Sequence, residues 1–324
     1  MILKALVQLV AAAGIVGIMP VDAAALELQV GKAVTSDPLF AAAAFTPGPF
    51  LPLAKTVVPA PPIKSDSDSY GIVTTAASVI VQDAGSGEVL FAKRPEDVRA
   101  IGSISKLMTA LVYLDTQPDL EQRFAQLEED FAGGGRVYLY YRDPLTLRDI
   151  LGAMMVGSDN TATMTIVRAS GLTQADFVAQ MNSKAAEMGL TNTHFEDPTG
   201  LSANNVSTAE ELVVLLAAAR QNDVLAGYMR TDTYVATHNS GRSVSIPSTD
   251  LLLSSAMNTG DYRVTAGKTG YIPQAGYCLV TEIREGEHEI FVVVLGAPEK
   301  EDRFTDAISL SSWAFKTFTW PDEL

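Results

Sequence analysis

Two polar side chains in one short apolar segment of the sequence have the types and the spacing that acyl transfer needs. The segment IGSISKLMTA, residues 101–110, holds Ser103 and Lys106 among apolar residues that predict a buried helix. Residues three apart lie on one helical face, so these two side chains should meet. A serine attacks a carbonyl only when a base takes its proton, and burial makes a lysine such a base by lowering its pKa. The pair therefore predicts Ser103 as a nucleophile and Lys106 as its base, at a helix N-terminus whose free N–H groups favour a developing anion.

Two further polar motifs follow in the chain. GSDN places Ser158 and Asn160 directly after a predicted helix, and AGKTGY places Lys268 just before an apolar strand. Such triplets arise by chance in few chains of this length, so three motifs in this order are difficult to attribute to chance. If the motifs meet, Ser158 can pass a proton between Lys106 and a leaving amine, while Asn160 can hold Lys106 or a substrate amide. The charge of Lys268 should lower the pKa of Lys106 further.

The three motifs together resemble the S-x-x-K, S-D-N and K-T-G set of penicillin-recognising serine enzymes, namely penicillin-binding proteins and class A β-lactamases. The resemblance to low-molecular-mass D-Ala-D-Ala peptidases runs from about Thr74 to Phe318 and is carried by SISKLMTA, MGLTNTHFEDPTGLSANNVSTAEEL and KTGYIPQAGYCLV. It implies a serine-type DD-peptidase that cleaves peptidoglycan stem peptides through an acyl-enzyme and is acylated by β-lactam antibiotics.

The resemblance also implies roles for the last motif. Lys268 and Thr269 would bind the carboxylate of the substrate. The oxyanion would lie between the backbone N–H groups of Ser103 and Tyr271. Gly270 would let the substrate backbone approach the strand closely.

Several alternatives stay open within this family. A class A β-lactamase needs a glutamate in an E-x-x-L-N stretch, and none occurs between Asn160 and Lys268, so we expect a penicillin to leave slowly. Leu324 directly follows the last predicted helix, so we expect neither a further β-domain nor a C-terminal membrane anchor. That short form favours an endopeptidase over a carboxypeptidase. A non-catalytic peptidoglycan-binding relative is the third alternative, and Asp159 is expected to point outward because the family tolerates other residues there.

Other chemistries find little support in the sequence. The histidines are His194, His238 and His288, without a G-x-S-x-G elbow, and His288 is expected on an exposed strand. A phosphate-binding loop before Gly267 would need a glycine where Tyr262 stands. No Cys/His cluster predicts a metal, and no cofactor is expected. A net charge of −15 argues against nucleic-acid binding.

The surrounding pattern predicts the elements that position these residues. Strands are expected at both ends of the domain, at residues 77–93 around a Gly-Ser-Gly turn and at residues 276–297 around Gly286. Helices are expected between them, and a last helix includes Phe304, Ala307, Ile308, Phe315 and Phe318 at helical spacing. The predicted internal helices cover residues 103–114, 147–157, 175–190 and 207–221, with Thr146 and Ser207 or Thr208 as N-caps. The fold class is therefore α+β: an antiparallel sheet built from both ends of the domain, faced by helices, with a helical insert.

Composition divides the chain into three parts. Residues 1–25 follow the order of a secretory signal peptide, which predicts export to the periplasm. Residues 26–69 are rich in Ala, Pro and Ser and predict an extended linker, largely disordered. Residues 70–324 form the predicted catalytic domain. Cys278 is the one cysteine, so no internal disulfide is possible and a buried thiol is expected.

Overall fold

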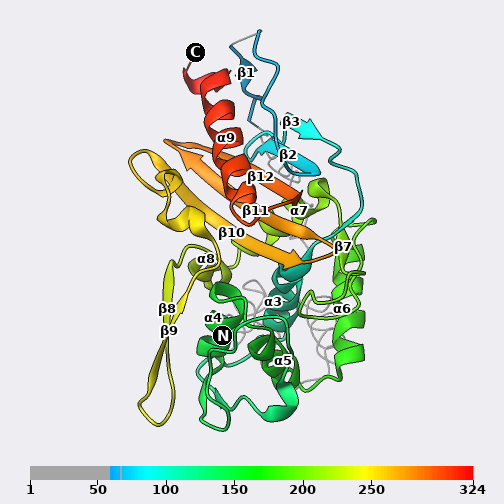
Figure 1. Ribbon diagram of the computed structural model, residues 1–324, viewed down its shortest axis with the longest axis vertical. Helices are drawn as coiled ribbons and strands as arrows, with labels where there is room; N and C mark the ends of the chain where they lie inside the picture. The colour runs from blue at the N-terminus through cyan, green and yellow to red at the C-terminus, as the bar shows by residue number, and fades with distance from the viewer. Residues whose placement is uncertain (1–58, 66–67, 324) are drawn as a thin grey trace, which may run out of the picture. The chain divides into compact units, whose positions relative to one another are not determined.

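Five antiparallel strands form the central sheet of the computed structural model, which describes residues 59–65 and 68–323 (Figure 1). Across the sheet the strands come in an order that joins the two ends of the domain: β10 (Tyr262–Ile272), β11 (Gly276–Glu285), β12 (His288–Ala297), β2 (Ser78–Asp83) and β3 (Val89–Lys93). Both the Gly-Ser-Gly hairpin and the hairpin around Gly286 are therefore confirmed. The α+β fold class is confirmed as well.

Helices cover both faces of this sheet, and this explains the unbroken apolar run of β12. Val292 and Val294 belong to the core beneath α9 (Asp302–Thr317), whereas Val293 and Leu295 belong to the core beneath α7 (Ala209–Arg220). A strand buried on both faces needs no polar alternation. Cys278, in the neighbouring strand, is fully buried as predicted.

The helical insert follows the predicted order. Its helices are α3 (Lys106–Asp115), α4 (Leu147–Val156), α5 (Asn160–Ala169), α6 (Gln174–Glu187), α7 and α8 (Asp223–Met229). The predicted caps are confirmed: Thr146 accepts from the backbone N–H of Asp149, and Thr208 accepts from that of Glu211. The short helices α5 and α8 were not predicted.

The described residues also form four two-stranded sheets. They pair β1 (Ile63–Lys64) with β13 (Phe318–Thr319), β4 (Arg99–Ala100) with β7 (Val206–Ser207), β5 (Arg123–Phe124) with β6 (Leu145–Thr146), and β8 (Thr233–Thr237) with β9 (Ser243–Pro247). The β8–β9 hairpin projects from the helical part in Figure 1 and was not predicted.

The ends of the domain correct two expectations. Ile63–Lys64 belongs to the predicted linker but forms a two-residue antiparallel pairing with β13. Phe318 falls at helical spacing but is the extended C-cap of α9 and forms that partner strand. Spacing alone gave no reason to end the helix before it.

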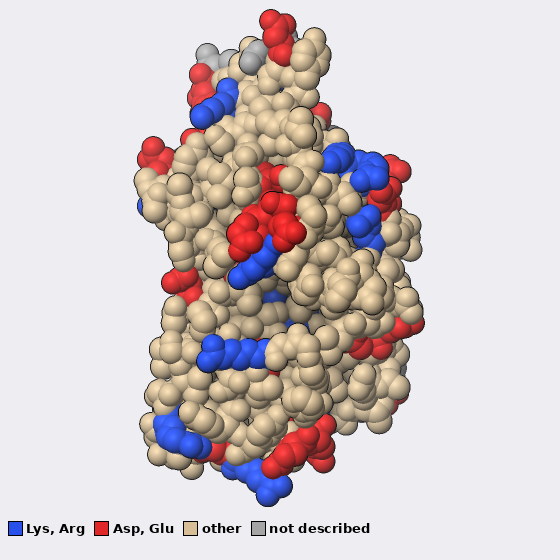
Figure 2. Space-filling model, in the orientation of Figure 1, with Lys and Arg blue, Asp and Glu red and all other residues tan. Residues whose placement is uncertain are grey.

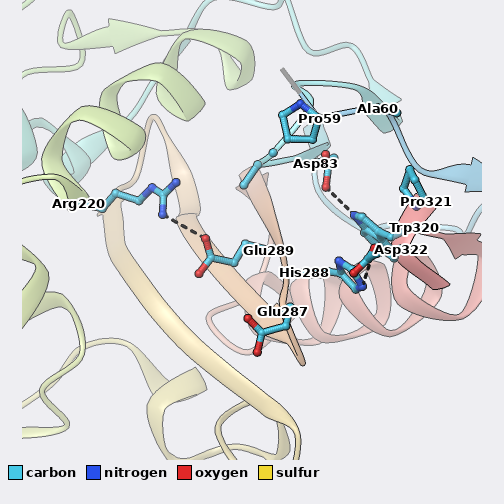
Figure 3. A pocket seen from close by; sticks show the side chains of 12 residues that line it. Pro59, Ala60, Asp83, Arg220, Glu287, His288, Glu289, Trp320, Pro321 and Asp322 are labelled. Carbon is cyan, nitrogen blue, oxygen red and sulfur yellow. Dashed lines mark hydrogen bonds and ion pairs between the residues drawn. The ribbon is translucent and has the colours of Figure 1, made fainter. Parts of the chain in front are cut away.

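The segment after α9 folds back over the sheet and covers His288, which the sequence placed on an exposed strand. The ring of His288 stacks on Trp320 with centroids 4.6 Å apart, and its side chain is only 15% exposed. Trp320 in turn donates from Nε1 to Asp83 Oδ1 at 2.8 Å. Figure 3 shows this contact beside a cavity that Pro59 also lines. Stacking on Trp320 therefore covers a side chain that was expected to be exposed.

The predicted signal peptide and most of the predicted linker lie outside the described residues. Within the described part of the chain, no helix combines the length and the apolar character needed to cross a membrane.

Candidate active site

Ser103 and Lys106 meet as predicted, but in a different local structure. Ser103 lies in a 3₁₀ turn, Gly102–Ser105, and Lys106 is the first residue of α3. Lys106 is fully buried, and its Nζ lies 3.0 Å from Ser103 Oγ. The tighter turn brings the nucleophile and the base together just before the helix starts.

The contacts of Lys106 define the proton arrangement at its amine. Nζ lies 2.6 Å from Asn160 Oδ1 and 2.5 Å from the Thr199 carbonyl oxygen. Both oxygens can only accept, so Nζ donates to both of them. A neutral amine has two N–H bonds and one lone pair, and the lone pair is then left for the O–H of Ser103. This is the geometry of a base aimed at a nucleophile.

Burial supplies the neutral form. It lowers the pKa of Lys106 to about 7, against the charges of Asp197 and Asp159, which raise it. The predicted cause is therefore right, but the predicted help from Lys268 is not among the causes. Instead, burial and then the charge of Lys106 hold the pKa of Lys268 well below its usual range.

Ser158 and Lys268 form the second half of the site. Lys268 Nζ lies 2.9 Å from Ser158 Oγ and 3.0 Å from the Thr269 carbonyl oxygen. Ser158 has a left-handed backbone, with φ +57°, which is costly for a residue with a side chain. The loop thus holds the Ser158 hydroxyl against the lysine at the expense of backbone strain. The sequence had suggested that Lys268 precedes a strand, but it lies inside β10.

The remaining residues of the K-T-G motif lie along β10. Thr269 Oγ1 is 2.6 Å from Thr249 Oγ1, a partner that the sequence did not indicate. A Cβ on Gly270 would lie 2.1 Å from the Ile101 carbonyl oxygen, so this glycine allows β10 to pack against the segment before Ser103. That gives the glycine a reason other than the expected close approach of the substrate. Tyr271 is 48% exposed.

Asp159 corrects the expectation that it points outward. Its side chain is fully buried and caps α5, accepting from the backbone N–H of Ala162 at 3.0 Å. It also accepts from the backbone N–H of Tyr138 at 2.9 Å, and burial raises its pKa. Asn160 therefore begins a helix, and the cap fixes its orientation. Its Nδ2 donates to the Gly133 carbonyl oxygen at 2.8 Å, which leaves Oδ1 for Lys106.

Sequence reasoning did not assign a role to the loop that supplies the second acceptor for Lys106, the Thr199 carbonyl oxygen. Asp197 accepts from the backbone N–H groups of Thr199, Gly200 and Ser202 at 2.6–2.8 Å. Its burial would raise its pKa, but the hydrogen bond from the Thr199 hydroxyl and those from the backbone N–H groups outweigh burial and lower the pKa. The carboxylate thereby holds the Thr199 carbonyl oxygen toward Lys106. The Asp-Pro-Thr-Gly turn was visible in the sequence and is typical of such a local network.

Gly200 provides a direct test of this packing. It has φ +87°, and a Cβ there would lie 2.1 Å from the Gly102 carbonyl oxygen and 2.8 Å from the Ser103 backbone nitrogen. We expect Gly200→Ala to displace Ser103 and to slow its acylation by penicillin on the order of 100-fold. Gly189→Ala is the matched control, because Gly189 has φ +76° and open space around it. Stopped-flow acylation rates check this. Equal rates for the two variants would contradict it.

Ser103 is partly exposed, whereas Lys106 and Lys268 are buried. In Figure 2 the middle of this face is recessed, and basic atoms are visible at the bottom. Within the described residues, no group of three or more His, Cys, Asp or Glu side chains could hold a metal ion. The arrangement offers a serine, a neutral amine, a second hydroxyl beside another lysine, and a strand edge for a peptide. That set can carry out acyl transfer.

Comparisons with known proteins agree with this chemistry. The family model described as D-alanyl-D-alanine carboxypeptidase matches residues 65–299. A D-alanyl-D-alanine endopeptidase of Pseudomonas aeruginosa is 32% identical over 241 residues, covering 74% of this chain and 76% of the relative. One from Escherichia coli is 30% identical over 279 residues, covering 85% and 87%. The crystal structure of the Streptomyces K15 DD-transpeptidase is similar at a TM-score of 0.70 and 26% identity, covering 76% of this chain and 100% of that one. All eight predicted site residues lie in the matched range.

Proposed function

Because the chain belongs to the D-alanyl-D-alanine carboxypeptidase family of serine hydrolases, we propose that it cleaves peptidoglycan stem peptides at D-Ala, with Ser103 as the nucleophile. The observation that carries the proposal is the contact of Lys106 Nζ with one hydroxyl and two obligatory acceptors. The hydroxyl that donates to the remaining lone pair is that of the nucleophile. Lys106 and Ser158 would move protons, and Asn160 would hold Lys106.

Acylation would start with proton transfer from Ser103 Oγ to Lys106 Nζ as Oγ attacks the carbonyl carbon of the penultimate D-Ala. The carbonyl oxygen would take up the negative charge, held by the backbone N–H groups of Ser103 and Tyr271. Lys268 and Thr269 would bind the carboxylate on the leaving side. This assignment is supported by Lys268, a buried amine whose hydrogen-bond partners among the described residues are two oxygens.

Collapse of the intermediate would break the C–N bond. The leaving amine needs a proton, and the proton on Lys106 would reach it through the hydroxyl of Ser158. Water would then attack the ester, with Lys106 again as the base, and release the acid and free Ser103. Protons and bonds balance over the cycle, and no cofactor is needed.

Two rival activities can be separated from this one. A class A β-lactamase would hydrolyse the penicillin ester quickly, and the sequence lacks the E-x-x-L-N stretch that supplies the water-activating glutamate. A non-catalytic relative would bind peptidoglycan without an acyl-enzyme. The contact of Lys106 with Ser103 and that of Lys268 with Ser158 favour catalysis over binding alone.

Within the family we propose a preference for cross-links, that is, endopeptidase over carboxypeptidase activity. Both relatives described above are named endopeptidases. We also propose that the enzyme acts in the periplasm, where its substrate lies. The support for this location is the N-terminal sequence pattern.

Purified muropeptide dimers that carry a terminal D-Ala-D-Ala test the preference. We expect the dimers to be converted to monomers faster than the terminal D-Ala is released, with both products separated by chromatography and identified by mass. Ser103→Ala protein is the blank for each product. Release of terminal D-Ala with the dimers left intact would reverse the assignment to carboxypeptidase.

A further inference from the structure

Arg99 lies beside the active site, and its side chain has no hydrogen-bond or ion-pair partner among the described residues. It lies in β4, in the segment that leads into Ser103, and its side chain is half-buried. Its Nε is buried and has no hydrogen-bond acceptor, and its guanidinium makes no ion pair or ring contact with any residue in 59–65 or 68–323. A buried guanidinium N–H without an acceptor costs free energy. Such an arginine points to a ligand that supplies the acceptor.

Arg99 lines an open cavity of about 460 Å³ at the end of β10. Tyr271 lines the same cavity and stacks on Tyr277, with ring centroids 4.3 Å apart and planes at 22°. A Cβ on Gly296 would lie 2.6 Å from Arg99 Nη2, so the glycine makes room for the guanidinium. Glu299 also lines the cavity but forms no ion pair with Arg99. The cavity therefore combines a free cation, a flat aromatic wall and space.

The direction of the substrate leads into this cavity. Under the proposed function, the carboxylate lies at Lys268 and Thr269, and the attacked carbonyl lies at the backbone N–H of Tyr271. A peptide that passes these two points in that order continues beyond Tyr271, along the end of β10. The residues upstream of the cleaved bond must then lie at the cavity that Arg99 lines.

We propose that Arg99 binds a carboxylate of the stem peptide upstream of the cleaved bond and so sets the preference for acidic stem peptides. Planar guanidinium and carboxylate groups pair through two parallel hydrogen bonds, which also fixes the orientation of the peptide. The inference rests on the proposed function, because it takes the substrate direction from that function. Arg99 acts in recognition and does not take part in the proton transfers.

Synthetic pentapeptides test this subsite. The reference peptide is L-Ala-γ-D-Glu-diaminopimelate-D-Ala-D-Ala. One arm replaces diaminopimelate by lysine, and the other amidates the α-carboxylate of D-Glu. We expect wild type to prefer the reference over one of them by at least about tenfold in kcat/KM, the size of one charge-assisted hydrogen bond. The modified peptide that wild type cleaves less well than the reference identifies which carboxylate Arg99 binds.

Variants then assign the preference to Arg99. Arg99→Gln is expected to bring the ratio of kcat/KM values close to one, chiefly through KM, and Arg99→Lys is expected to keep part of it. Arg284→Gln is the matched control, since Arg284 is exposed at the other end of the strand that holds Tyr277 and should keep the wild-type ratio. Stoichiometric penicillin labelling reports whether each variant retains an intact site.

The outcomes separate the subsite from the function. If Arg99→Gln keeps the wild-type ratio of kcat/KM values, or if wild type shows no preference, the subsite is overturned while the proposed peptidase function stands. Wild type that is labelled by penicillin but cleaves none of the peptides would also overturn it. Wild type that is neither labelled nor active would overturn the proposed function itself, and the subsite with it.

Discussion

Ser103→Ala is expected to lower kcat for release of D-Ala from a stem pentapeptide by at least about 10⁴-fold. The hydroxyl is the atom that forms the ester, and in serine peptidases the loss of the nucleophile removes nearly all of the rate enhancement that the catalytic residues provide. Quantification of free D-Ala over hours measures this range. The fold should persist, because the replaced hydroxyl contacts only Lys106 among the described residues.

Ser105→Ala is the control for this change. Ser105 lies in the same 3₁₀ turn, and its Oγ contacts the Gly102 carbonyl oxygen and Asn205 Nδ2 rather than Lys106. Its loss should cost stability but less than about tenfold in kcat, apart from what partial unfolding removes. If Ser103→Ala keeps more than about 1% of wild-type activity while it is folded, Ser103 is not the nucleophile.

Lys106→Met is expected to slow acylation of Ser103 by penicillin at least about 10³-fold, since general-base assistance contributes typically 10²–10⁴-fold. Methionine preserves the length and the apolar stem but has no lone pair to accept the proton of Ser103. The acylation rate of wild type should rise with pH and level off above about pH 7, because Lys106 accepts a proton only in its neutral form and its pKa is about 7. Lys106→Met should lack this rise. Pre-steady-state acylation from pH 5.5 to 9 measures both effects.

A control variant and a stability measurement distinguish loss of the base from an effect of the substitution on folding. Lys184→Met removes a lysine that pairs with Asp115 at the C-terminal end of α3, away from Lys106, and it should keep the wild-type pH profile. The free energy of unfolding supplies the second readout. The folded pKa of Lys106 is lower than its unfolded value, so burying the charge costs stability in full below pH 7, and that cost disappears as the pH rises toward 10. The stability of wild type relative to Lys106→Met should therefore increase from pH 6 to pH 9. A flat profile in wild-type acylation would contradict the role of Lys106.

The central parts of the site could be predicted because their chemistry depends on local spacing. Ser103 and Lys106 are three positions apart at a helix start, which suffices to bring them together, and the second and third motifs each keep their polar residues adjacent. The contact of Asn160 with Lys106 and that of Lys268 with Ser158 join distant segments. Only the family resemblance indicated that these segments meet.

The errors have physical reasons that the local pattern does not contain. Asp159 was expected to point outward because the family tolerates other residues there, whereas it caps a second helix that starts at once, and a cap can be buried. The carbonyl oxygen of Thr199 could not be predicted, because a backbone acceptor carries no mark of its function in the sequence. The partner of Ile63–Lys64 lies at the other end of the chain, so no local pattern in the Pro-rich segment indicated a strand.

One measurement tests the central claim most directly: the intact mass of the purified protein after incubation with benzylpenicillin, followed by mapping of the modified peptide. We predict that the mass increases by one whole penicillin molecule, that the adduct persists for many minutes after the free drug is removed, and that Ser103 carries it. An unmodified protein with an intact fold, a modified residue other than Ser103, or an adduct lost within seconds as hydrolysed penicillin accumulates would contradict the account.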